Sequence, residues 1–196
     1  MSKVGIFGGS FNPIHKGHTE LARTAFKMLK LDEMLIIPTA QSPHKQTAEV
    51  SFEARAEMCR LAFENDKGFV ISDIEKQLGG TSYTINTVRA LKEIYPKKTE
   101  FYLIIGGDML FYFENWYRHE ALLKECHVVA AARENDSYVD MLEYANELGR
   151  VKVLNLPVVE ISSTELRKKL RNGEDCGDML DEKVVAYIAE RGIYRD

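Results

Sequence analysis

Two glycines and two histidines lie close together near the N-terminus, in the stretch GGSFNPIHKGH at residues 8–18. Paired glycines let the backbone turn tightly and approach a ligand closely. His15 and His18 are three residues apart, so on the first turn of a helix they share one face. Both imidazoles can donate hydrogen bonds to phosphate oxygens, and a helix beginning here adds its free N–H groups. The stretch therefore indicates an anion site.

Other interpretations of this stretch remain open. Glycine pairs are frequent at turns between strands and helices, and a histidine pair at this spacing can also bind a metal, although no third ligand is evident nearby. The pattern is neither the G-x-G-x-x-G of dinucleotide-binding folds nor the G-x-x-x-x-G-K-[ST] of P-loops. A plain turn and a phosphate site are both consistent with these residues taken alone.

A second group of polar residues, ISSTELR, lies at residues 161–167. Ser162 and Glu165 have the spacing of a capping box at a helix start. Ser163 and Thr164 add hydroxyl groups, and Arg167 adds a cation whose planar fork matches phosphate oxygens. Taken alone, the segment also fits a well-capped surface helix with an exposed arginine.

The elements that position these residues alternate between strand and helix along the whole chain. Short apolar runs predict strands at residues 3–7, 34–37, 69–74, 101–105, 128–132 and 151–154. Helical spacing predicts helices at residues 16–30, 51–66, 84–95, 121–124 and 138–148, and two more within 162–172 and 181–192. This alternation predicts an α/β fold with a doubly wound, Rossmann-like parallel sheet, in which ligands bind at the carboxyl ends of the strands. The informative loops are then 8–18, 38–48, 75–84, 106–117 and 155–163, within one domain spanning residues 1–196.

Composition narrows the class of protein. The 196 residues carry a net charge of −4, which disfavours a nucleic-acid partner. Cys59, Cys126 and Cys176 are widely spaced, which argues against a disulfide framework or a structural zinc site and favours a reducing, cytoplasmic location. No apolar run reaches the ~20 residues of a membrane span, so no membrane partner is expected.

The two polar groups together resemble the signatures of the HxGH nucleotidyltransferase superfamily: His15-Lys16-Gly17-His18 and the I-S-S-T-x-x-R at residues 161–167. The resemblance implies the nucleotidyltransferase fold, an ATP site between the two signatures, and His15, His18 and Arg167 as catalytic residues. It implies Mg²⁺ bound with ATP and no metal held by the protein. The implied ATP contacts are Gly8, Gly9, Ser10, Phe11, His15, His18, Gly106, Asp108, Ile161, Ser162, Ser163, Thr164 and Arg167.

Three further segments, SPHK at 42–45, GGTSYT at 79–84 and residues 104–117, resemble those of bacterial nicotinate mononucleotide adenylyltransferases. The resemblance implies transfer of AMP from ATP to nicotinate mononucleotide, giving deamido-NAD and pyrophosphate in NAD biosynthesis. Trp116, the only tryptophan, could stack on an electron-poor pyridinium ring. The expected mononucleotide contacts are Lys45 (beside His44), Ser82, Tyr83, Thr84, Met109, Tyr112, Trp116 and Arg133. A homodimer is left open.

The chain departs from the family pattern at two places. The family often has Thr-Phe-Asp-Pro where this chain has Ser10-Phe11-Asn12-Pro13, so Asn12 is given no catalytic role. Glu134-Asn135 replaces a common Pro-Gly, which puts the loop after Arg133 in doubt. Three alternative assignments fit less well. The same chemistry on phosphopantetheine is disfavoured by the Ser-Tyr-Thr and Trp116 elements, and a nucleotide-binding module without catalysis by the intact His15, His18 and Arg167. An aminoacyl-tRNA synthetase core is disfavoured by the missing tRNA-binding domain.

Overall fold

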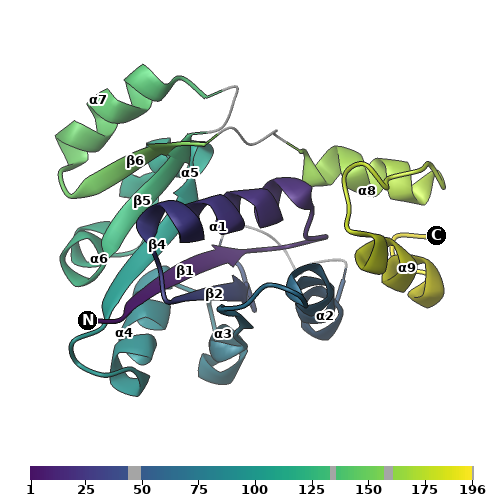
Figure 1. Cartoon of the computed structure of the whole chain (residues 1–196), viewed down its shortest axis with the longest axis horizontal. Helices are drawn as coiled ribbons and strands as arrows, with labels where there is room; N and C mark the ends of the chain where they lie inside the picture. Colours follow the sequence, from purple (N-terminus) through teal and green to yellow (C-terminus); the bar gives the residue numbers. More distant parts are fainter. Residues whose placement is uncertain (44–49, 133–135, 157–160, 196) are drawn as a thin grey trace.

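A parallel sheet of six strands forms the centre of the molecule in the computed structural model, which describes residues 1–43, 50–132, 136–156 and 161–195 (Figure 1). The strands are β1 (Lys3–Gly9), β2 (Glu33–Pro38), β3 (Phe69–Ile71), β4 (Glu100–Gly106), β5 (His127–Ala132) and β6 (Val151–Asn155). Their spatial order is β3-β2-β1-β4-β5-β6, and every neighbouring pair is parallel. The prediction of a doubly wound parallel sheet is confirmed.

Helices connect the strands and cover both faces of the sheet. They are α1 (Lys16–Leu29), α2 (Phe52–Phe63), α3 (Ile74–Leu78), α4 (Thr84–Ile94), α5 (Gly107–Phe111), the 3₁₀ helix η1 (Phe113–Asn115), α6 (His119–Glu125), α7 (Tyr138–Leu148), α8 (Ser163–Arg171) and α9 (Glu182–Arg191). Figure 1 shows α8 and α9 side by side, next to the end of β1 and the start of α1.

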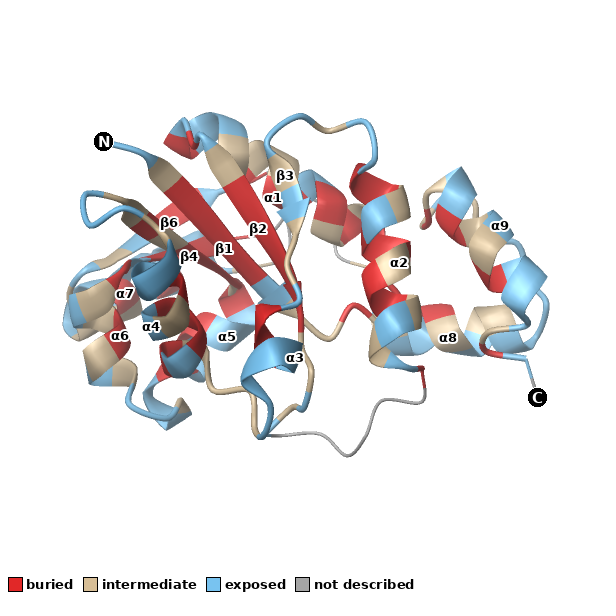
Figure 2. Ribbon diagram, turned by 90° about the horizontal axis from the view of Figure 1, so that it is seen from below, coloured by how far each residue is buried: buried red, intermediate tan, exposed pale blue. Residues whose placement is uncertain are grey.

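Alternate residues of the strands build two apolar cores. Phe7 of β1 and Ile36 of β2 belong to the core formed with α1, α2 and the C-terminal helices. Their neighbours Ile6 and Leu35 belong to the opposite core, formed with α3 to α7. Figure 2 shows the central strands as continuous buried segments. Burial on both faces explains why these strands are unbroken apolar runs in the sequence.

Two loops expected after strands contain short helices instead. Strand β3 ends at Ile71, and Ile74 begins α3 rather than ending the strand, with its side chain buried in the second core. The loop 75–84 therefore contains most of α3, and the loop 106–117 contains α5 and η1. A five-residue helix is little more than one turn, so it leaves no periodic pattern to read in the sequence. Helix α2 also ends at Phe63, earlier than expected.

The centre of the sheet contains the switch point of the fold. Strands β1 and β4 are neighbours, with Ile6 opposite Leu103. From β1 the chain crosses to β2 on one side, and from β4 it crosses to β5 on the other. The two connections diverge at the carboxyl ends of these strands and leave a crevice between them, which is the usual ligand site of such folds.

Candidate active site

A cleft of about 400 Å³ opens at the carboxyl ends of the central strands. Its walls include residues 8–10 at the end of β1, Thr39, Ser42 and Pro43 after β2, residues 82–84 before α4, and Gly106, Asp108 and Met109 after β4. Four segments that the sequence predicted to carry ligand contacts therefore meet around one space.

His15 and His18 hold each other in a reciprocal capping arrangement at the start of α1. The Nδ1 atom of His15 accepts the His18 backbone N–H at 3.4 Å, and the Nδ1 atom of His18 accepts the His15 N–H at 3.3 Å. The two rings stack with their centroids 3.5 Å apart. Because each Nδ1 accepts a hydrogen bond, each neutral ring carries its proton on Nε2. Both rings are thus fixed as donors through Nε2.

Phe11 supports this pair from the interior. Its side chain is only 2% exposed, and its ring meets the His18 ring edge-on, 5.2 Å between centroids and 88° between planes. Phe7 packs against Phe11 in turn, 5.6 Å away. The Phe11 side chain therefore positions His18, and a contact of Phe11 with ATP would have to come from its backbone.

The C-terminal motif lies directly against the histidine turn. The Nε2 atom of His15 donates to Ser163 Oγ over 3.0 Å, although 148 residues separate them. Arg167 donates through Nη1 to the backbone oxygen of Asn12 at 2.8 Å and through Nη2 to Thr164 Oγ1 at 3.2 Å. The imidazoles and the guanidinium consequently lie on one side of the molecule. We call His15, His18, Ser163, Thr164 and Arg167 the phosphate cradle.

Local capping explains why α8 begins where it does. Ser162 is the N-cap of α8, and its hydroxyl oxygen accepts the Glu165 backbone N–H at 3.4 Å. This contact is one of the two hydrogen bonds of the expected capping box. It places Ser163 and Thr164 in the first turn of the helix, where the backbone N–H groups favour an anion.

Residues near the C-terminus also bind the segment that contains Asn12 and His15–His18. Lys16 donates its backbone N–H to Met179 O at 2.9 Å and its ammonium group to Gly177 O at 2.8 Å. The hydroxyl of Tyr194, a buried residue, donates to Asn12 Oδ1. Asn12, to which we assigned no catalytic role, is thus held by Tyr194 through its side chain and by Arg167 through its backbone.

Six of the predicted mononucleotide contacts line the cleft. Trp116 lines it and packs on Phe113, with ring centroids 5.5 Å apart. Tyr83 packs against Tyr117 at 4.5 Å, and Thr84 begins α4. Ser82, Met109 and Tyr112 complete this lining. His44, Lys45 and Arg133 lie outside the described residues.

Sequence reasoning missed the buried charged residue Arg55. It lies on α2, is 3% exposed, and donates to the carbonyl oxygens of Ser10 at 2.7 Å, Thr39 at 2.8 Å and Val50 at 3.2 Å. Burial lowers the pKa of Arg55. The guanidinium ties the loop after β1 to the loop after β2, which are two walls of the cleft. An arginine on a helix normally signals a solvated face, so the sequence offered no warning of this role.

Glu75 and Tyr117 also line the cleft and were not predicted. Burial raises the pKa of the Glu75 carboxyl, and hydrogen bonds from Ser82, Ala40 and Thr87 act against that rise. No signal for Glu75 was available because α3 itself was not expected. Tyr117 directly follows the predicted Trp116, and its aromatic character was the one available clue.

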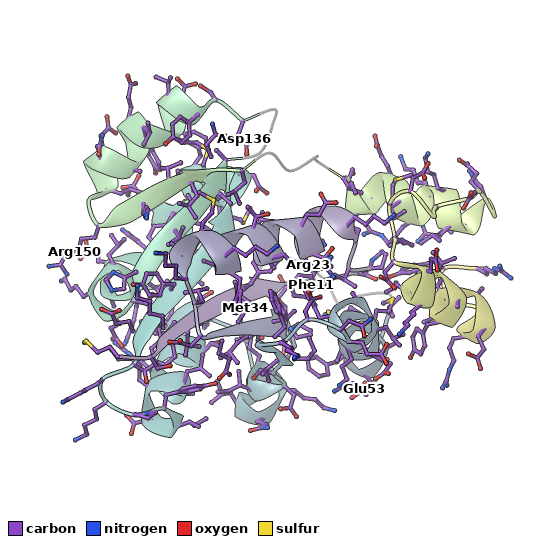
Figure 3. The ribbon with its side chains drawn as sticks, in the orientation of Figure 1. Phe11, Arg23, Met34, Glu53, Asp136 and Arg150 are labelled. Carbon is purple, nitrogen blue, oxygen red and sulfur yellow. The ribbon has the colours of Figure 1, made fainter. Side chains whose placement is uncertain are left out.

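Acidic side chains lie close to the two glycines at the end of β4 and the start of α5. A methyl group on Gly106 would lie 2.7 Å from Asp108 Oδ1, and one on Gly107 would lie 2.6 Å from Asp136 Oδ2. Figure 3 shows Asp136 near the start of α7. Asp136 therefore packs against the first residue of α5, the helix that carries Asp108 into the cleft.

Two negative findings concern the described ranges. Within them, acidic, histidine and cysteine side chains form no group of three or more that could hold a metal ion. None of the helices in the same ranges has both the length and the apolar character needed to cross a membrane.

The fold and the cleft define an α/β protein of the Rossmann-like, nucleotide-binding class. The sequence profile described as cytidylyltransferase-like matches residues 6–169, a span that contains both polar motifs. A probable nicotinate-nucleotide adenylyltransferase of Lachnoclostridium phytofermentans is 38% identical over 99% of this chain and 100% of its own length. One from Thermotoga maritima is 36% identical over 93% of this chain and 89% of its own.

The fold comparison agrees with the sequence comparison. The structure of Plasmodium falciparum nicotinic acid mononucleotide adenylyltransferase complexed with NaAD superposes with a TM-score of 0.84 and covers 99% of this chain and 98% of its own, at 21% identity. The chain belongs to the cytidylyltransferase-like family and, within it, to the nicotinate-nucleotide adenylyltransferases. The family assignment expected from the two motifs is confirmed.

Proposed function

We infer that this chain transfers the AMP moiety of ATP to nicotinate mononucleotide, giving deamido-NAD and pyrophosphate as a step of NAD biosynthesis. The observation that carries the assignment of roles to residues is the hydrogen bond between His15 and Ser163. It joins the two distant motifs into one donor surface beside the cleft. A surface of this kind suits a triphosphate, because imidazole, hydroxyl and guanidinium donors converge on the same place.

The reaction is a displacement at the α-phosphorus of ATP. A phosphate oxygen of the mononucleotide forms a new bond to the α-phosphorus, the bond to the β-phosphate bridging oxygen breaks, and pyrophosphate leaves with that electron pair. The attacking phosphate is already anionic, so the protein supplies neither a nucleophile nor a strong base. Its contribution is to position the two reactants and to stabilise the charge that develops.

The cradle residues and the neighbouring Ser162 divide this work. His15 and His18 act near the bond that breaks: His18 offers its Nε2–H, and His15 exchanges its bond to Ser163 Oγ for one to a phosphate oxygen when ATP binds. Ser162, Ser163, Thr164 and Arg167 hold the β- and γ-phosphates. Arg167 uses part of its fork on Asn12 and Thr164, and the fork has further N–H groups to offer a phosphate.

Other parts of the cleft take the two nucleosides. Gly8, Gly9, Ser10 and Gly106 allow close approach of adenosine, and Asp108 accepts hydrogen bonds from ribose hydroxyls. At the opposite end, Trp116 stacks on the nicotinate ring. Thr84, at the start of α4, lies where the nicotinate carboxylate binds.

ATP binds together with Mg²⁺, which neutralises part of the triphosphate charge. The cradle consists of imidazoles, hydroxyls and a guanidinium and contains no carboxylate, the side chain that most often binds a hard cation. These groups fit a metal ion held by phosphate oxygens and water. We also propose a cytoplasmic location, which the three free, buried cysteines support.

Pyrophosphate release tests the function. Purified protein with Mg-ATP should release pyrophosphate with nicotinate mononucleotide and much more slowly with the amide form, because donors aimed at a carboxylate match an amide poorly. Equal rates with both acceptors would contradict the specificity. Release with phosphopantetheine and none with either mononucleotide would contradict the function itself.

Substituting Trp116 tests the ring site. Trp116→Ala should raise the KM for nicotinate mononucleotide about 10-fold or more, while the KM for ATP changes little, because stacking on the pyridinium is lost. Phe111→Ala is the matched control, since Phe111 is an exposed aromatic residue of α5 that is not part of the cleft lining. An unchanged mononucleotide KM in Trp116→Ala would remove Trp116 from the site.

A further inference from the structure

Glu75 is a carboxylate placed at the wall of the cleft with little access to water. It lies in the first turn of α3, is 8% exposed and belongs to the cleft lining. Its Oε2 accepts the backbone N–H of Ala40 at 3.3 Å, and its Oε1 accepts the hydroxyl of Thr87 at 3.2 Å. The hydroxyl of Ser82 also hydrogen-bonds this carboxylate. Three donors from three different segments therefore converge on one side chain.

These partners form the wall of the cleft on the mononucleotide side. Ala40 belongs to the loop that follows β2, Ser82 to the loop that precedes α4, and Thr87 to the first turns of α4. The two loops are also paired directly: the Ser82 N–H donates to Gln41 O at 2.9 Å, and the Gln41 N–H donates to Ser82 Oγ at 3.1 Å. Glu75 lies where the loop after β2, the loop before α4 and α4 meet.

The hydroxyl of Ser82 is held within this wall. Its oxygen accepts the Gln41 N–H at 3.1 Å, and the hydroxyl lies close enough to Glu75 to favour the ionised carboxylate. The side chain of Ser82 is thus part of the wall, and the two residues that follow it, Tyr83 and Thr84, are the ones presented to the nicotinate group.

We propose that Glu75 is a positioning residue for nicotinate mononucleotide: its carboxylate holds Ala40, Ser82 and Thr87 together and thereby fixes the loop that presents Tyr83 and Thr84. This role rests on the proposed function, because it concerns the acceptor half of the same cleft. Glu75 acts through its neighbours and takes no part in the displacement at phosphorus.

The chemistry of the site explains why a carboxylate is needed there. Burying a charged group is costly unless hydrogen bonds and a nearby opposite charge compensate. Glu75 has three donors, and Arg55 lies close enough to favour the ionised form. A glutamine would keep the shape but turn an NH₂ group toward donors. The hydroxyl partners would have to reverse their direction, the charge that strengthens these contacts would be lost, and the loop would loosen.

Kinetics of Glu75→Gln test the proposal. The KM for nicotinate mononucleotide should rise at least about 10-fold, whereas the KM for ATP and kcat should stay within about 3-fold of wild type. The mononucleotide Kd, read from the fluorescence of the single tryptophan, should rise in parallel. Glu57→Gln is the matched control, because Glu57 is an exposed carboxylate of α2 whose ion-pair partner, Arg60, lies on the same helix. It should leave all three quantities unchanged.

A second substitution keeps the proposal testable if Glu75→Gln folds poorly. Thr87→Val preserves shape and removes one donor to the carboxylate, so it should raise the same KM about 3-fold or more. The double variant should show less than the product of the single effects, because both changes act on one contact.

Different results would contradict the role of Glu75 and the proposed function. An unchanged mononucleotide KM in both single variants would overturn the role of Glu75, as would equal rises in the KM values for both substrates. Wild-type protein that releases no pyrophosphate with nicotinate mononucleotide would instead overturn the proposed function, and the role of Glu75 with it.

Discussion

Replacing Arg55 with methionine should destabilise the protein markedly, although the change is conservative in size. Methionine keeps most of the apolar volume of the side chain but removes every donor. The carbonyl oxygens of Ser10, Thr39 and Val50 each lose the guanidinium N–H that now satisfies them. Arg55 is almost fully buried, so water can replace these bonds only in part.

The expected magnitude follows from the three lost hydrogen bonds. A hydrogen bond to a charged group contributes about 1.5 kcal/mol or more to stability. Burial lowers the pKa of Arg55, which shows that the cation itself is costly to bury, and removing it offsets part of the loss. The net fall in unfolding free energy should be about 3 kcal/mol. This is a large share of the ~5–15 kcal/mol of a typical domain.

Urea denaturation of the two variants on α2 measures the effect. Arg55→Met should lower the urea midpoint without changing the m-value, and the melting temperature should fall by roughly 6–12 °C. Arg60→Met, in which an exposed arginine loses its partner Glu57, should change the free energy by less than about 0.5 kcal/mol. A loss below about 1 kcal/mol for Arg55→Met would refute the view that its three contacts hold the loops together.

Three further predictions concern other contacts. His18→Ala should lower kcat roughly 10²-fold or more in the pyrophosphate assay, since one charge-stabilising donor is lost, and near-normal turnover would exclude that role. Tyr194→Phe removes the hydroxyl bound to Asn12 and should lower the free energy of unfolding in urea by about 1 kcal/mol; no change would show the contact to be unimportant. Hydrogen bonds from Arg89 hold the pKa of Glu125 below its usual range. The pair should therefore stabilise the protein above the ordinary glutamate pKa and lose this effect as pH falls through the lowered value. Arg89→Met should be less stable than wild type at pH 7, the difference should close as the pH falls through the lowered pKa of Glu125, and a gap that persists once this carboxyl is protonated would contradict this.

Much of the fold was predictable because the spacing of apolar residues along the sequence matches the side chains that are buried in the structure. The strand at residues 101–105 and the helix at residues 138–148 correspond to β4 and α7, because an apolar run and a helical repeat each leave a clear pattern. The short helices α3 and α5 were missed because a single turn has no repeat. The last residues assigned to β3 were wrong for the same reason, since Ile74 is apolar whether it ends a strand or begins a helix.

Some residues of the candidate site could be predicted from the sequence, and others could not. His15, His18 and Arg167 could be named from residue type and spacing. Arg55 and Glu75 could not, because a charged residue is normally exposed and only its surroundings reveal that it is buried. Asn12 was given no catalytic role on the evidence of a lost negative charge, and its contacts with Arg167 and Tyr194 became visible only when the chain ends met.

The sequence by itself determined the alternation of strands and helices and the chemistry available at each strand end, because both depend on neighbouring residues. Tertiary structure alone decided which strand ends are adjacent, since strand order depends on how the connections cross the sheet. It also decided that Ser163 lies 3.0 Å from His15. Contacts over such separations arise from the packing of α1 against the C-terminal helices, and no local pattern encodes a distance between segments that meet only in the folded chain.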